Sequence, residues 1–313
     1  MSDTLLAEFP VRVTNLDKPL WPEAGITKAD YIQYMIEMSP HLVRHLQDRP
    51  LTVVRFPHGI HEKSFYQKNA PKDTPEWVQT FAVYSKDSDR DIHYILANNT
   101  ATLIWLANQA CIELHPWYTK IQAPDSPTNI AIDLDPSAPG FEKVRKVAFA
   151  VKAVLDDLGF PSYPKTSGAT GLQIFIPLKQ GFTFRQTRVI TEFIGRYLAS
   201  QYPDLATVER LVKDREDKVY VDYLQHAPNK TLVSPYSPRP VPDAKVSAPL
   251  TWEELAAGAV PEDFTIRTML ERVKKVGDLF APMEQSGVDI TGVLHFIENH
   301  PLRTANIKNS EWR

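Results

Sequence analysis

The sequence predicts a mixed α/β fold, because short apolar strands alternate with amphipathic helices along the chain. Residues 141–158 carry valine, alanine and leucine at helical spacing, and Gly159 follows at a position that commonly ends a helix. Residues 130–134 form an apolar run with two carboxylates, Asp133 and Asp135, before Pro136, which is typical of a strand and its end. A chain of 313 residues is long enough to bury a sizeable core around these elements.

Composition narrows the class of protein. Hydrophobic residues make up 43% and charged residues 23% of the chain, which is ordinary globular usage. The net charge of −3 means that any site for a polyanion must be a local patch. A single cysteine, Cys111, excludes a disulfide framework and indicates a reducing compartment, so we expect the cytoplasm. We expect no signal peptide and no membrane partner, since no run approaches the roughly 18 apolar residues that a membrane span requires.

The first long helix is predicted to begin after Thr27, because Asp30 lies three positions later in an approximate capping box. The loop before it, residues 17–25, carries Lys18 and Trp21. Apolar side chains at helical spacing mark the buried side of this helix: Tyr31, Tyr34, Met35, Met38 and Leu42.

The other elements follow from residue composition and turn signals. A buried helix is expected over residues 100–114, with His115 at its end. Strands are expected over residues 11–16, 51–56, 78–84, 92–95, 163–166, 172–176 and 218–223, and the third and fourth of them flank a polar loop at 85–91. Further helices are expected over residues 185–202, 252–257 and 266–276, and a fraying tail over 306–313.

Three aspartates in two predicted strands form the first candidate site. Side chains alternate between the faces of a strand, so Asp133 and Asp135 project from the same face. Asp222 interrupts a second apolar strand, where an isolated carboxylate is unfavourable. If the two strands are neighbours, the three carboxylates can hold two divalent ions about 3.5–4 Å apart, which suits an in-line phosphoryl displacement. The alternatives are surface acids at a strand end, and a cap or an arginine partner for Asp222.

The second candidate is a turn with two glycines at residues 165–171, in which successive backbone N–H groups can bind an anion. A plain hairpin turn is the alternative, since the chain contains no Walker or dinucleotide-binding glycine motif. Arg239 lies in a proline-stiffened loop and can grip a phosphate with two N–H groups. Solvation is the default for each of a scattered set of cations: Lys18, Lys28, Arg55, Lys68, Arg215, Lys218 and Arg239.

Three motifs follow one another along the chain: Asp133-Leu134-Asp135-Pro136, Thr166-Ser167-Gly168-x-x-Gly171-Leu172 and Tyr220-Val221-Asp222-Tyr223-Leu224-Gln225. Together they resemble the archaeo-eukaryotic primase superfamily. The resemblance is stronger to the polymerase domain of bacterial DNA ligase D, the primase-polymerase of non-homologous end joining. It extends from Asn15-Leu16-Asp17-Lys18 to Arg239.

The resemblance implies a role for each matching position. Asp133, Asp135 and Asp222 would be the catalytic and metal-binding residues, for two ions of manganese or magnesium. The ribo- or deoxyribonucleoside triphosphate would be bound by Arg55, His115, Ser167, Gly168, Thr170, Gln173, Arg215 and Arg239. Gapped or broken DNA would be bound by Lys18 and Lys28, which match lysines that grip a 5′-phosphate, by Phe65 and Tyr66, which match a stacking pair, and by Lys68. Residues 85–91 resemble a loop that helps to bring two DNA ends together.

The chain departs from the family pattern at four positions. Many relatives have Lys, Lys, His and Asn where this chain has Val54, Thr170, Gln173 and His226. Fewer cations near the triphosphate predict weaker nucleotide binding, because Gln173 can donate a hydrogen bond but carries no charge. No K-x-D-G ligase motif is visible, so a stand-alone polymerase module is expected.

The resemblance implies a single primase-polymerase domain over residues 1–313. It would comprise an N-terminal α/β part (1–125) with the DNA-end contacts, an RRM-like antiparallel catalytic core (126–240) and a C-terminal helical part (241–313). The implied activity is template-directed nucleotide addition at gaps and ends during double-strand-break repair, at the nucleoid, with Ku and a separate DNA ligase as expected partners. Two alternatives stay open: a primer-independent RNA primase, and a non-catalytic module that binds DNA ends.

Overall fold

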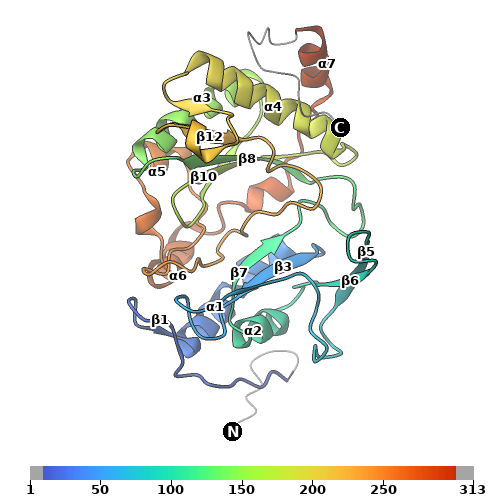
Figure 1. Cartoon of the computed structure of the whole chain (residues 1–313), viewed down its shortest axis with the longest axis vertical. Helices are drawn as coiled ribbons and strands as arrows, with labels where there is room; N and C mark the ends of the chain where they lie inside the picture. The colour runs from blue at the N-terminus through green and yellow to red at the C-terminus, as the bar shows by residue number, and fades with distance from the viewer. Residues whose placement is uncertain (1–9, 301–313) are drawn as a thin grey trace.

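The computed structural model describes residues 10–300, and in that part of the chain two five-stranded sheets lie one above the other (Figure 1). Helices α3 (Glu142–Asp157) and α4 (Phe184–Gln201) cover the upper sheet, while α1 (Lys28–Leu46) and α2 (Thr100–Asn108) lie beneath the lower one (Figure 1). The predicted mixed α/β fold is confirmed. The tail predicted over residues 306–313 lies outside the described residues.

The upper sheet contains β8 (Asn129–Pro136), β9 (Tyr163–Thr166), β10 (Leu172–Pro177), β11 (Ala206–Thr207) and β12 (Val219–Asp222). Its strand order is β11-β12-β8-β10-β9, and every neighbouring pair is antiparallel except β11 with β12. Apart from β11, the chain runs β8-α3-β9-β10-α4-β12, which is the split β-α-β-β-α-β arrangement. The RRM-like antiparallel sheet is therefore confirmed.

The two helices of the upper sheet agree with their predicted bounds to one residue at each end. Helix α3 buries Val144, Val147, Val151 and Leu155, and Gly159 follows it with a φ of +69°. Helix α4 begins at a capping box formed by Thr183 and Gln186. Both helices pack on the face of the sheet that carries Leu134, so the opposite face, with the aspartates, points towards the lower sheet.

The lower sheet contains β3 (Leu51–Arg55), β4 (Phe65–Gln67), β5 (Thr80–Ser85), β6 (Arg90–Ile95) and β7 (Cys111–Pro116). The order is β4-β3-β6-β5, and β7 also pairs with β3. The hairpin predicted around the polar loop is confirmed as β5 and β6.

The helix predicted over residues 100–114 is wrong in its second half. Helix α2 ends at Asn108, Ala110 adopts a φ of +55°, and the chain then enters β7. Helix and strand are both apolar and nearly contiguous, so the spacing of hydrophobic residues could not separate them. His115 therefore lies in a strand, paired with Thr52, and not at the end of a helix.

The strand predicted over residues 11–16 is also wrong. The side chain of Asn108 binds this segment, accepting from Thr14 N at 2.9 Å and donating to Arg12 O at 3.1 Å. Backbone groups that a strand partner would use are thus bound by an amide side chain. Instead, the predicted loop after it contains β1 (Pro19–Trp21), which forms a small hairpin with β2 (Ile26–Thr27) directly beyond the loop.

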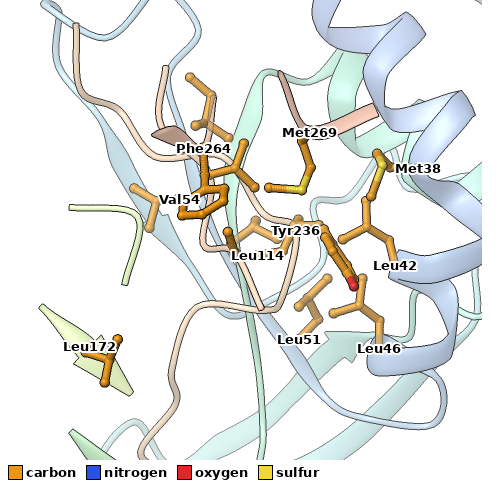
Figure 2. Close-up of a cluster of buried hydrophobic side chains, with 14 of the residues drawn as sticks. Met38, Leu42, Leu46, Leu51, Val54, Leu114, Leu172, Tyr236, Phe264 and Met269 are labelled. Atoms are coloured by element: carbon orange, nitrogen blue, oxygen red, sulfur yellow. The ribbon is translucent and has the colours of Figure 1, made fainter. Parts of the chain in front are cut away.

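Helix α1 begins at the predicted capping box, and all five predicted apolar positions are buried. Figure 2 shows Leu42 and Leu46 of this helix beside the buried ring of Tyr236, which belongs to the proline-rich segment after β12. The Tyr34 hydroxyl donates to Tyr236 O at 2.7 Å, which ties this late segment to the first helix.

The C-terminal part is helical. It contains α5 (Trp252–Ala256), α6 (Ile266–Val276) and α7 (Thr291–Asn299), and the short 3-10 turns are η1 (Val212–Asp214), η2 (Pro261–Asp263) and η3 (Ala281–Glu284). None of the helices in residues 10–300 is long and apolar enough to cross a membrane.

Candidate active site

The three predicted catalytic aspartates meet on the inner face of the upper sheet. Asp222 is the register partner of Asp133, and Tyr220 is the partner of Asp135. Directly opposite side chains of an antiparallel pair lie about 5 Å apart on one face. The condition set by the sequence, that the two strands be neighbours, is met.

Burial and mutual repulsion perturb these carboxyl groups. Burial raises the pKa of Asp133 well above its usual value, and the charges of Asp135 and Asp222 raise it further. Gln173 and Lys165 act in the opposite direction on the same pKa. The pKa of Asp135 is also raised, first by burial and then by Asp222. Such a cluster becomes fully ionised readily only when a cation shares it.

The donor set fits a hard divalent cation. Asp133 Oδ1 is buried and has no hydrogen-bond partner among the described residues. Asp222 Oδ1, by contrast, accepts from the Tyr220 hydroxyl at 3.0 Å and from two backbone N–H groups beyond the strand at 3.0 and 3.1 Å. Within residues 10–300 no group of three acidic, histidine or cysteine side chains is placed to hold a metal ion as the side chains stand. The unpartnered carboxylate oxygen is nevertheless the kind of ligand that manganese and magnesium take.

A cavity of about 200 Å³ opens beside the aspartates and extends to the turn between β9 and β10. It brings together seven residues that the sequence singled out: His115, Asp133, Asp135, Ser167, Thr170, Gln173 and Arg239. Two carboxylates and several side chains that can donate hydrogen bonds therefore line the same cavity.

Two glycines allow the turn to lie this close to the sheet. Gly168 has a φ of +73°, and a Cβ there would lie 2.7 Å from Arg239 Cγ. A Cβ at Gly171 would lie 2.5 Å from Leu134 O and 3.3 Å from Asp135 Oδ1. Either contact would force the backbone apart, so both positions require glycine for a steric reason.

Ser167 organises the turn. Its Oγ accepts from Ala169 N at 3.2 Å and from Gly171 N at 3.0 Å. Two of the N–H groups proposed for an anion nest are thus used inside the turn. The hydroxyl proton of Ser167 can still donate towards the cavity.

Glu113 is a site residue that the sequence reasoning missed. Its Oε1 accepts from Arg239 Nε at 2.6 Å, its Oε2 lies 3.2 Å from His115 Nε2, and Arg239 NH1 donates to Ser167 O at 2.6 Å. Burial raises the pKa of Glu113, but His115 and Arg239 together outweigh it and hold the pKa below its usual value. The sequence does contain a signal for Glu113. It lies two positions before His115, and residues two positions apart share one face of a strand.

Three predicted nucleotide-binding residues do not line this cavity in the described structure: Gly168, which lies in the turn itself, Arg55 and Arg215. Arg215 lies on the far side of the aspartates, 3.8 Å above the ring of Tyr220, and its guanidinium donates to two backbone carbonyls. Arg55 is held by Gln109 and Gln67 at the end of the interior strand β3. Arg215 still acts on the acids, since its charge lowers the pKa of Asp135.

The predicted DNA-binding residues lie on the lower half. Lys18 and Lys28 flank the β1–β2 hairpin, and burial, with a contribution from Lys18, lowers the pKa of Lys28 to about 8. Phe65 and Tyr66 are 47% and 60% exposed on the edge strand β4, and Lys68 follows that strand. Large exposed aromatic rings on an edge strand are free to stack against a partner.

Comparison with known proteins connects this site to a family. The family described as LigD, primase-polymerase domain matches residues 27–280. The chain belongs to the LigD primase-polymerase family. The bifunctional non-homologous end joining protein LigD of Bacillus subtilis is 40% identical over 289 residues, which are 91% of this chain and 46% of that protein. The multifunctional LigD of Mycolicibacterium smegmatis is 33% identical over 279 residues, 88% of this chain and 36% of that protein.

A solved LigD structure shares the fold. The polymerase domain from Mycobacterium tuberculosis ligase D, in complex with DNA, matches with a TM-score of 0.83 and 30% identity, over 89% of this chain and 99% of that one. The chain spans less than half the length of the two LigD relatives named above. The predicted family and the predicted primase-polymerase fold are confirmed.

The four departures from the LigD pattern differ in their relation to the cavity. Thr170 and Gln173 line it, whereas Val54 is buried in β3 at 9% exposure. His226 is fully buried with Nε2 2.8 Å from Thr187 Oγ1, and burial lowers its pKa to about 3. Of these four, only Thr170 and Gln173 bear directly on a ligand in the cavity.

Proposed function

We propose that the chain is a DNA-directed nucleotidyltransferase that adds a nucleotide to a primer 3′-hydroxyl, at gaps and broken ends with a 5′-phosphate. One observation carries the proposal. Three aspartates meet on adjacent strands, and two of them, Asp133 and Asp135, line a cavity that Ser167, Gln173 and Arg239 also line. Acids that hold cations, placed beside donors for phosphate oxygens, are the two parts that phosphoryl transfer requires.

In the proposed reaction the 3′-oxygen of the primer attacks the α-phosphorus of a nucleoside triphosphate. A new ester bond forms, the bond from the α-phosphorus to the α,β-bridging oxygen breaks, pyrophosphate leaves, and the hydroxyl proton passes to solvent. Arg239 and Ser167 would bind the leaving phosphates, and Glu113 holds the Arg239 guanidinium in place through Nε. Positioning and charge compensation supply most of the rate in such reactions.

Asp133, Asp135 and Asp222 would hold two divalent ions, with manganese favoured. These ions would lower the pKa of the attacking hydroxyl and offset the charge that develops on the phosphates. The buried, unpartnered Oδ1 of Asp133 supports this assignment, because an isolated buried carboxylate oxygen is unfavourable without a cation.

The DNA would lie between the lower half and the aspartates. Lys18 and Lys28 would bind the 5′-phosphate, and Phe65 and Tyr66 would stack on the template and the pairing base. We propose Ku and a separate DNA ligase as partners in end joining, at the nucleoid. The DNA-bound LigD polymerase domain that shares the fold supports a nucleic-acid partner.

Primer extension tests the proposal directly. The substrate is a duplex with a short gap and a 5′-phosphate, incubated with manganese or magnesium and with each ribo- and deoxyribonucleotide in turn. Template-directed extension of the primer supports the polymerase. Products that start without a primer would identify a primase instead, and tight binding without any extension would identify a non-catalytic end-binding module.

A further inference from the structure

A row of four polar side chains crosses the inner face of the upper sheet, and its last member, Lys165, lies outside the cavity described above. Asp222 faces Asp133, Asp133 faces Gln173, and Gln173 faces Lys165 on β9. Since paired side chains share a face about 5 Å apart, Lys165 lies two strands from Asp133, behind Gln173 as seen from the aspartates.

Lys165 is enclosed to an unusual degree for a lysine. It is 0% exposed, and its Nζ donates to Gln173 Oε1 and to Ser247 Oγ, both at 2.5 Å. The ring of Phe175 lies 5.7 Å from the same Nζ. Lysine is almost never fully buried without a partner, and both hydrogen-bond partners here are neutral. A buried lysine that binds two neutral acceptors in this way fixes the orientation of both.

The contact determines which way the Gln173 amide faces. Lys165 Nζ donates to Gln173 Oε1, so the Gln173 amide turns its oxygen towards Lys165 and its NH₂ group away from it. That NH₂ group then faces the aspartates and the cavity that Gln173 lines, and Gln173 indeed lowers the pKa of Asp133. Without Lys165 the amide could turn over and present its oxygen to an incoming polyphosphate.

The second contact of Lys165, with Ser247, connects it to the segment that carries Arg239. Ser247 Oγ donates to Thr166 O at 2.9 Å, and Ser247 N donates to Ser237 O at 3.0 Å. Arg239 lies two residues beyond Ser237, in the same segment. Lys165 therefore anchors the segment that carries Arg239 to the sheet, and it also orients Gln173.

We propose that Lys165 is a positioning residue of the nucleotide site: it orients the Gln173 amide as a donor to the triphosphate and fastens the Arg239 segment beside it. This inference rests on the proposed nucleotidyl transfer. Gln173 carries no charge, but its fixed amide can only donate towards the cavity. The contact with Lys165 therefore compensates in part for the neutral residue at this position.

A double-mutant cycle in the full chain tests the inference by primer extension at fixed manganese. Lys165→Met is an unbranched side chain one atom shorter with no donor, and Gln173→Leu removes the amide. Each single variant should raise the nucleotide KM roughly tenfold, as expected for one hydrogen bond to a charged group, with kcat changed far less. The KM of the double variant should be about that of Lys165→Met alone, because both changes remove the same oriented donor.

Three outcomes would overturn the inference: an unchanged KM in Lys165→Met, a kcat loss without a KM change, or single effects that multiply in the double variant. If Lys165→Met does not fold, Gln173→Glu replaces it, because a carboxylate keeps Lys165 partnered but cannot donate. A wild-type KM in Gln173→Glu would then refute the oriented amide. Absence of extension by the wild-type protein would refute the proposed function itself, which distinguishes the two failures.

Discussion

Lys28 is expected to give 5′-phosphate recognition a pH dependence of its own. The side chain is 4% exposed, and burial together with Lys18 lowers its pKa from 10.5 to about 8. About nine-tenths of Lys28 is then charged at pH 7 and about one-tenth at pH 9, by the ordinary titration relation. If the charged form binds the 5′-phosphate, the preference for phosphorylated ends should fall about tenfold between these pH values.

The same shift predicts an opposite effect on stability. The pKa is lower in the folded state, so the unfolded chain binds more protons between pH 8 and the ordinary lysine value near 10.5, and stability should rise with pH across that window. Below pH 8 the charged Lys28 costs the fold about 3 kcal/mol, from 1.36 kcal/mol per unit of pKa. Lys28→Met should therefore stabilise the free protein at pH 7 while weakening the binding of 5′-phosphorylated DNA.

The assay compares anisotropy titrations of gapped DNA with a 5′-phosphate or a 5′-hydroxyl at pH 7, 8 and 9 and constant ionic strength. The ratio of the two affinities cancels changes elsewhere on the protein. Lys28→Arg is the matched control, because a guanidinium stays charged and the ratio should then be flat with pH. Urea unfolding gives the stability. A wild-type ratio that is constant from pH 7 to 9, or a Lys28→Met variant less stable than wild type at pH 7, would refute the reasoning.

Three further predictions concern the cavity. Asp133→Ala or Asp135→Ala should abolish nucleotide addition in primer extension while leaving DNA affinity largely intact; near-normal extension would remove the two-metal interpretation. Thr170→Lys adds a charge beside the Ser167 turn and should lower the nucleotide KM several-fold, whereas Arg239→Ala should raise KM. The reason is that a charged hydrogen bond contributes roughly 1.5–3 kcal/mol. If neither variant changes KM, the triphosphate binds elsewhere. Gly168→Ala places a Cβ 2.7 Å from Arg239 Cγ, so it should lower the melting temperature and raise KM together, and a melting temperature equal to wild type would contradict the packing argument.

The sequence was sufficient where one local signal decided the structure. The capping box at Thr27 and the glycine after residue 158 predicted helix bounds closely, because caps and left-handed residues end helices for reasons contained in a few residues. The alternation of side chains along a strand was enough to put Asp133 and Asp135 on one face of the sheet. The pairing of Asp222 with Asp133 needed the register of two strands separated by more than 80 residues, and only the motif order anticipated it.

Elsewhere the sequence could not decide. The boundary between α2 and β7 falls inside one apolar run, and Glu113 was missed because a helix was expected there. Arg215 and Arg239 looked equivalent as loop arginines, yet Arg215 stacks on Tyr220 and Arg239 reaches Ser167. Which side of the aspartates a loop arginine occupies depends on the path of the whole loop, and local composition does not determine that path.

The residues proposed to bind phosphate, and the glutamate that holds one of them, come from parts that lie far apart in the sequence. Glu113 comes from the lower sheet, Ser167 from the turn of the upper sheet and Arg239 from the proline-rich segment. Arg239 joins them with two hydrogen bonds of 2.6 Å, and Glu113 is nearly buried, so separating the sheets would leave an unpaired charge inside the protein. Correct docking of the two halves and correct placement of the arginine are therefore one event. The donors face the aspartates only when the sheets are packed as they are here.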